Sequence, residues 1–154
     1  MNRKERDTLR GLAEQVAAIA ALPVQQETIA AHKALNALKP TRPMVMIDQV
    51  CWHEMNVDDE LTLRTKDPFC RGLETHLRRT LYQWKHMRGD MVVEPSLDLG
   101  KAIRGADFGL GIVEHTAVTD PTSDVCGHHY HDQLATDADL AKIRTPQIWH
   151  DEKA

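Results

Sequence analysis

The chain has 154 residues, 42% of them hydrophobic and 27% charged, which predicts one packed domain and excludes a disordered chain. With a formal net charge of −4, the chain lacks the positive electrostatic potential that binds nucleic acid. Its apolar runs are all much shorter than the roughly 20 residues of a membrane span. The first residues also lack the pattern of a signal peptide. Because of the net charge, nucleic acid is not an expected partner, and because of the short apolar runs, neither is a membrane.

The N-terminal part of the chain has the pattern of two helices. Residues 9–20 place apolar side chains at helical spacing, and an alanine-rich segment over residues 24–38 repeats the pattern. Pro23 separates the two segments, and the prolines of "KPTRP" stop the second. We therefore predict an N-terminal helical segment, residues 1–40, folded as a helical hairpin.

Two short apolar runs then predict buried strands on either side of a long helix. "MVMI" at 44–47 has the continuous apolar character of a strand in a parallel sheet, and "MVVEP" at 91–95 has a similar character. Between them, residues 59–67 predict a short strand or a loop. Asp67 is a predicted N-cap and Pro68 a first-turn residue, so we predict a long helix that begins here and ends at about Arg88. A helical crossover makes the two strands parallel.

The last third of the sequence predicts one more strand and a short helix. "FGLGIVEHTAV" at 108–118 is typical of a strand with glycine-permitted turns. Thr136 and Asp139 have capping-box spacing, and Pro146 closes the helix that they begin. The order of elements is that of an α/β protein.

The cysteines, Cys51, Cys70 and Cys126, are widely spaced and form no C-x-x-C pair. This spacing predicts neither a disulfide framework nor a zinc ribbon. Free thiols are typical of a reducing compartment, so a cytoplasmic location is expected.

Several motifs between Arg42 and Pro146 resemble the uroporphyrinogen decarboxylase (URO-D) superfamily. They are "ADFG" at 106–109, "DLAKIRTP" at 139–146 and "GDMVVEPSLDL" at 89–99, which looks like that superfamily's second strand. The resemblance implies that residues 41–154 form the N-terminal part of a URO-D-like (β/α)8 TIM barrel. Such barrels exceed 300 residues, so it implies an incomplete barrel: an N-terminal fragment carrying the first β/α units.

One difference from true uroporphyrinogen decarboxylases bears on the reaction. Their first strand runs into a loop whose arginine and glycine grip porphyrin carboxylates, whereas "RPMVMIDQVCWHEMN" has neither residue after the strand. The chain therefore resembles divergent corrinoid-dependent methyltransferases more closely. That resemblance implies methyl transfer or a related decarboxylation, with zinc and a corrinoid protein in the complete enzyme and no cofactor held by this chain.

The incomplete barrel also implies what the chain does alone. The enzyme would be a methyltransferase or a decarboxylase (lyase) only when the missing C-terminal half of the barrel is present. We expect this chain by itself to be inactive and to self-associate, because its strands would expose unpaired edges.

The segment "WHEMN" at 52–56 follows the first predicted strand, where barrel enzymes place their chemistry. His53 is a candidate general acid or base, and Glu54 a candidate anchor for a polar substrate group. Trp52 and Asn56 are assigned to substrate binding. The alternative is an ordinary loop in which Trp52 packs and the two titratable residues face water.

Asp98, in "SLDL", follows the second predicted strand and is the third catalytic candidate. The resemblance implies a carboxylate there that holds a substrate nitrogen or stabilises a developing cation. The alternative is an Asp turn or a helix N-cap leading into "LGKAIRG". Since parallel strands end at one edge, His53 and Asp98 are expected to border the same pocket.

The stretch "VCGHHYHDQL" at 125–134 gathers residue types that bind transition metals. In an extended segment His129 and His131 share one face, and Cys126 and His128 share the other. Two ligands are fewer than the four of a closed zinc site, so we assign His129 and His131 to substrate binding and no residue to metal. The alternative function is a small stand-alone metal-binding or protein-interaction module that uses His128, His129 and His131.

Overall fold

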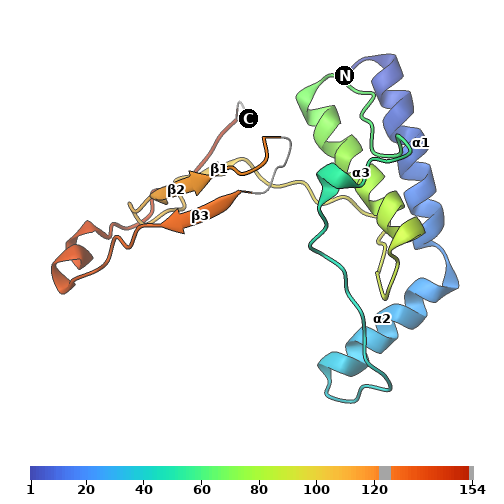
Figure 1. Ribbon diagram of the computed structural model, residues 1–154, viewed down its shortest axis with the longest axis horizontal. Coiled ribbons are helices and arrows are strands. Elements are labelled where there is room, and N and C mark those ends of the chain that lie inside the picture. Colours follow the sequence, from blue (N-terminus) through green and yellow to red (C-terminus); the bar gives the residue numbers. More distant parts are fainter. Residues whose placement is uncertain (122–125, 153–154) are drawn as a thin grey trace. The chain divides into compact units, whose positions relative to one another are not determined.

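The computed structural model describes residues 1–121 and 126–152, and the chain forms two compact units, Met1–Leu97 and Asp98–Ala154. The first unit contains the three long helices, and the second contains four short strands, so the chain is a mixed α/β protein (Figure 1). The predicted boundary at residues 40 and 41 lies inside the first unit. None of the described helices combines the length and the apolar character that crossing a membrane requires.

Helix α1 (Arg3–Ala20) begins where its sequence supplies a complete cap. Asn2 accepts a hydrogen bond from the Glu5 amide at 3.0 Å, and Glu5 accepts one from the Asn2 amide at 2.8 Å. The same Glu5 carboxylate accepts hydrogen bonds from the amides of Lys66 and Asp67. The backbone hydrogen bonds from Asn2, Asp67 and Lys66 lower the pKa of Glu5 to about 2.

Helix α3 (Pro68–His86) packs against α1 and forms the core of the first unit. The predicted cap is confirmed, because the Asp67 side chain accepts a hydrogen bond from the Cys70 amide at 3.0 Å. Both helices contribute apolar stripes at helical spacing. The buried apolar residues are Leu9, Leu12, Val16, Cys70, Leu77 and Val93.

One buried carboxylate fastens the loop before α3 to the helix itself. Glu74 is 0% exposed and accepts hydrogen bonds from the amides of Arg64 and Thr65, the Thr65 hydroxyl and Nε of Arg78. Burial would raise the pKa of Glu74, but these hydrogen bonds outweigh burial and hold it at about 2. Glu74 is therefore an ionised, fully bonded group inside the unit.

Helix α2 (Pro23–Asn36) forms as predicted, but the helical hairpin is wrong. α2 continues beyond the end of α1 after a bend, and α1 has α3 as its packing partner (Figure 1). The apolar stripe of α1 fits the leucine stripe of α3, whereas the alanine-rich α2 buries only Gln25 completely. The Gln25 side chain accepts a hydrogen bond from the Val93 amide at 2.9 Å.

The predicted strands at 44–47 and 91–95 are absent from the described structure, and so are the β/α units that they would begin. The segment 44–47 is not buried on both faces, since Val45 is 55% and Met46 61% exposed. A parallel sheet needs cover on both faces, and no described element of the unit provides it. The two segments still meet, because the Asp90 amide donates to the Val45 carbonyl at 2.8 Å.

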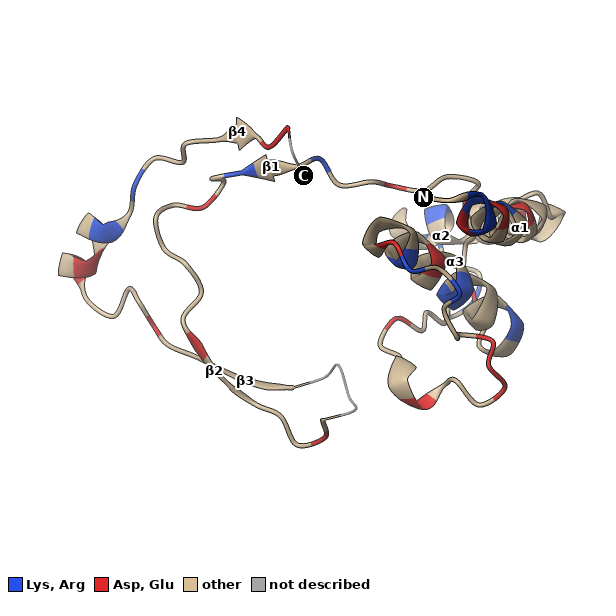
Figure 2. Cartoon of the chain, turned by 90° about the horizontal axis from the view of Figure 1, so that it is seen from above, with Lys and Arg blue, Asp and Glu red and all other residues tan. Residues whose placement is uncertain are grey.

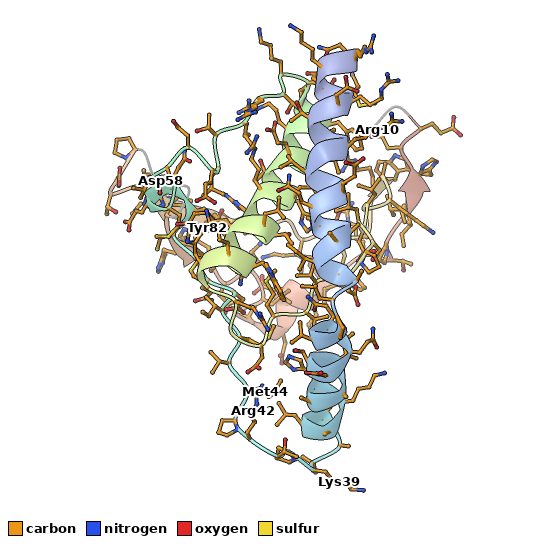
Figure 3. The ribbon with its side chains drawn as sticks, turned by 90° about the vertical axis from the view of Figure 1, so that its right-hand side faces the viewer. Arg10, Lys39, Arg42, Met44, Asp58 and Tyr82 are labelled. Carbon is orange, nitrogen blue, oxygen red and sulfur yellow. The ribbon has the colours of Figure 1, made fainter. Side chains whose placement is uncertain are left out.

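Asp90 holds this junction together. Its carboxylate accepts a hydrogen bond from the Val45 amide and forms an ion pair with Arg42. Both contacts lower the pKa of Asp90, and the one with Arg42 has the larger effect. Its carbonyl oxygen lies 2.9 Å from Nε2 of His32 on α2. Arg42 and Met44 lie on the segment that runs alongside α2 (Figure 3).

The second unit contains two antiparallel ribbons, in place of the parallel sheet that was predicted. Strand β1 (Ile103–Arg104) pairs with β4 (Trp149–His150), and β2 (Glu114–Ala117) pairs with β3 (Gly127–Tyr130). The predicted strand at 108–118 is thus confirmed for its last part. The predicted short helix forms as a 3-10 helix, η2 (Asp137–Lys142), with the Thr136 and Asp139 capping box in place.

A backbone contact joins the segment before β2 to the segment after η2. The Arg144 amide donates to the Phe108 carbonyl at 2.8 Å. The neighbouring Gly109 has φ of 81° and lies against the Arg144 side chain, 3.2 Å from Cγ at the position a Cβ would take. Only glycine adopts this backbone readily, so the residue permits the close approach.

Candidate functional site

The predicted site residues 52–56 lie in the first unit, on and after the short helix η1 (Trp52–Glu54). The Trp52 ring meets Tyr82 of α3 edge-on at 6.1 Å between ring centres, and Cζ of Arg79 lies 5.0 Å from its centre. Trp52 therefore packs against α3, and its predicted role in substrate binding stays a prediction.

The acid-base candidates beside Trp52 differ in exposure. The His53 side chain is 18% exposed and that of Glu54 is 66% exposed, with 3.5 Å between Nε2 of His53 and Oε1 of Glu54. Asn56 orders the following loop by accepting from the Leu61 amide and donating to the Thr62 hydroxyl. Their catalytic and substrate-binding roles stay predictions.

The placement of His53 and Asp98 at the ends of two parallel strands is wrong. Neither residue follows a strand, because 44–47 and 91–95 lie outside any helix or strand. Asp98 is exposed, outside any regular element, and no helix begins after it, so the N-cap alternative is also wrong. The connectivity argument required a sheet, and the described residues of the first unit contain none.

A cleft of about 600 Å³ lies beside α1 and α3 in the first unit. Its charged lining is largely paired within the protein: Glu60 binds Lys85 at 2.8 Å and His86 at 3.1 Å, and Arg78 binds Glu74. The bond from Lys85, followed by that from His86, lowers the pKa of Glu60. The lining, all within the described residues 7–85, includes none of the residues predicted for a site.

The β2–β3 hairpin of the second unit carries the histidine cluster. Its register pairs His115 with His129 and Glu114 with Tyr130. Residues directly opposite each other in an antiparallel pair share a face, and so do residues two apart along a strand. The hairpin therefore sorts its side chains into two sets.

One set, which we call the histidine face, consists of His115, His129 and His131. All three side chains are exposed. The ring centres of His115 and His131 are 4.7 Å apart, and those of His129 and His131 are 5.4 Å apart. The predicted sharing of a face by His129 and His131 is confirmed, and the structure adds His115 from the neighbouring strand.

The opposite face holds a chain of three polar side chains. Sγ of Cys126 lies 3.3 Å from Nε2 of His128, whose Nδ1 lies 2.8 Å from Oε2 of Glu114. The Tyr130 ring stacks on His128 at 5.7 Å. The predicted sharing of a face by Cys126 and His128 is confirmed. His128 faces away from His129 and His131, and a module that uses all three histidines stays a prediction. A thiol, an imidazole and a carboxylate in this order can pass a proton from sulfur to nitrogen.

His115 is the residue that sequence reasoning missed. It lies in "VEHTA", ahead of the cluster in the sequence, and only the pairing of β2 with β3 places it beside His131. One signal could have found it: residues 113–117 and 127–131 both alternate as strands do, which is the pattern of a hairpin. The connection, residues 118–126, is longer than a two-residue turn and lacks the Asn-Gly type of signal, which obscured the hairpin.

As their side chains stand, no group of three or more His, Cys, Asp and Glu residues forms a metal-binding set within 1–121 and 126–152. The quoted cluster begins at Val125, which lies outside the described residues. No protein-family model, curated protein or solved structure matches this chain.

Proposed function

We propose that the chain is the N-terminal part of an enzyme of the URO-D superfamily, acting in corrinoid-dependent methyl transfer or a related decarboxylation. The observation that carries the proposal is the bond between the Arg144 amide and the Phe108 carbonyl, at 2.8 Å. It joins the two motifs of the resemblance, "ADFG" and "DLAKIRTP", which are far apart in the sequence. The histidine hairpin lies between them along the chain.

Two features of the first unit also support the proposal. Val45 and Asp90 bind each other through two hydrogen bonds, so the segments that resemble the first two barrel strands start side by side. Val45, Met46 and Ile47 are exposed, as strands of a barrel would be before the rest of the sheet covers them. The cover would be the missing half of the barrel or a second copy of this chain.

In this proposal the chain's own residues bind and orient the substrate. The residues proposed for substrate contact are Trp52 and Asn56 in the first unit and His129 and His131 in the second. When bound, the corrinoid supplies a cobalt nucleophile that accepts the methyl group. The heteroatom left behind would keep the bonding electrons and take a proton, which His53 would donate while the neighbouring Glu54 orients the substrate. For Asp98, in the second unit, the proposed role is to balance positive charge.

The zinc of the resembled methyltransferases does not fit this chain as it stands. Activation of a substrate thiol would need a complete ligand set, and the described side chains stand in no such set. We therefore assign that zinc to the missing half of the barrel. The three free cysteines support a reducing location such as the cytoplasm.

The test is to read the coding sequence beyond codon 154 and to assay its product. The proposal predicts that the coding sequence continues with further barrel strands. It also predicts that the product either transfers a methyl group, detected by the colour change of cob(I)alamin, or releases carbon dioxide. In that product His129→Ala should raise KM roughly tenfold, since a polar substrate contact is lost. His76→Ala, at an exposed histidine of α3, is the matched control. A product with no barrel strands and neither activity would contradict the proposal.

A further inference from the structure

We infer that the histidine face, His115, His129 and His131, binds one divalent transition-metal ion such as Zn²⁺. Imidazole is a common ligand for zinc and its neighbours, and three ligands with one open position are typical of zinc sites that bind water or a substrate. The sequence alone offered two ligands for this face, and β2 supplies the third through its pairing with β3. This inference does not require the proposed enzyme family, and it assigns His129 and His131 to a metal ion in place of direct contact with a substrate.

The three rings lie close enough together for one ion to reach them once they turn. With metal–nitrogen bonds of about 2.1 Å, two histidine rings bound to one ion have their centres about 5 Å apart. The observed separations are 4.7 Å for His115 and His131, and 5.4 Å for His129 and His131. His115 and His129 lie directly opposite each other in the register, so the backbone already holds the three residues as neighbours.

The ring nitrogens do not converge as the side chains stand, and binding requires the rings to turn. The ring planes are nearly perpendicular, at 80° for His115 and His131 and 88° for His129 and His131. All three side chains are exposed, and exposed side chains change rotamer on a fast timescale. The strands fix the positions of the ligands, and rotation of the side chains completes the site.

The charge of the surrounding sequence favours a cation. Residues 105–141 contain no lysine and no arginine. The same stretch carries these acidic residues: Asp107, Glu114, Asp120, Asp124, Asp132, Asp137 and Asp139. Figure 2 shows acidic residues and no basic ones along the described part of the hairpin. A negative local field raises the concentration of metal ions at the neutral imidazoles.

The other face of the hairpin is the competing location. Cys126 and His128 are also metal-ligand types, but both nitrogens of His128 are already in contact with Sγ of Cys126 and the carboxylate of Glu114. A metal ion there would have to break one of these contacts. His128 is thus a matched control: the same residue type, on the same strand, facing the opposite way.

The test is calorimetric titration of the whole chain, without an affinity tag, with ZnCl₂ at neutral pH. The wild type should bind one ion per chain, and His115→Ala, His129→Ala and His131→Ala should each weaken binding at least about 100-fold, because loss of an outer-shell partner alone costs up to about that factor. His128→Ala should bind as the wild type does. The amide spectrum of the hairpin in each variant separates loss of a ligand from loss of the fold.

Co²⁺ provides a second readout that needs no variant. Imidazole ligands on the histidine face predict the visible bands of tetrahedral Co²⁺ without the intense near-ultraviolet band of a cobalt–thiolate bond. The inference is overturned if that thiolate band appears, if His128→Ala abolishes binding while His115→Ala does not, or if the wild type binds no stoichiometric metal.

Discussion

Replacing Glu74 by alanine is expected to lower the free energy of unfolding of the first unit by about 3 kcal/mol, the scale measured when one partner of a buried ion pair is removed. The side chain is 0% exposed, and its carboxylate is the acceptor for Thr65, Arg64 and Arg78. Without it, the Thr65 donors and Nε of Arg78, whose side chain is 10% exposed, lose their acceptor. Urea denaturation followed by helical circular dichroism measures the change.

Glu14→Ala is the matched control for this substitution. Glu14 is an exposed glutamate on α1, so its replacement should change the unfolding free energy by less than about 0.5 kcal/mol. Equal stability of the Glu74→Ala and Glu14→Ala variants would contradict the role given to the buried carboxylate.

Acidification is expected to destabilise the first unit between about pH 4.5 and pH 2. The pKa values of Glu5 and Glu74 fall from an ordinary 4.5 to about 2 in the folded chain, and the pKa of Asp90 is also lowered, mainly by Arg42. The unfolded chain therefore binds more protons than the folded chain in this window, and stability is lost as the pH falls. Thermal unfolding followed by circular dichroism at a series of pH values measures the effect.

The contribution of a single carboxyl can be isolated in the same experiment. Glu74→Gln removes one group that titrates, so its melting temperature should depend less steeply on pH below 4.5 than that of the wild type. Glu14→Gln should leave the wild-type slope unchanged. A wild-type melting temperature that stays constant down to pH 2 would show that these carboxylates are not bonded as described.

The helices were predictable because their signals are local. The apolar spacing of α1 and α3 and the cap at Asp67 specify a helix without reference to the rest of the chain, and the structure confirms them. The hairpin of α1 and α2 was wrong, since the partner of a helix is decided by which apolar stripe fits it. The strands at 44–47 and 91–95 were wrong for a related reason: a short apolar run gives no evidence of the neighbours that a buried strand needs.

The histidine face shows the same limit at the level of a site. Alternation along one strand placed His129 and His131 together and His128 apart from them, which needs only the period of two. The addition of His115 depends on which strand lies beside β3 and in which register, and no local pattern in this sequence specifies either. The hydrogen bonds of Glu74 and Asp90 were also missed. Asp90 bonds Val45, 45 residues away, and Glu74 bonds a loop whose path no local pattern specifies.

The register of β2 and β3 is the measurement on which the account depends most directly, because a slip of one residue would exchange the two faces of the hairpin. In a nuclear Overhauser spectrum of the isotope-labelled chain, the account predicts cross-peaks between the ring protons of His115 and His131, whose ring centres are 4.7 Å apart. Cross-peaks linking His115 to His128 instead, with none to His131, would contradict the histidine face and the two proposals that use it.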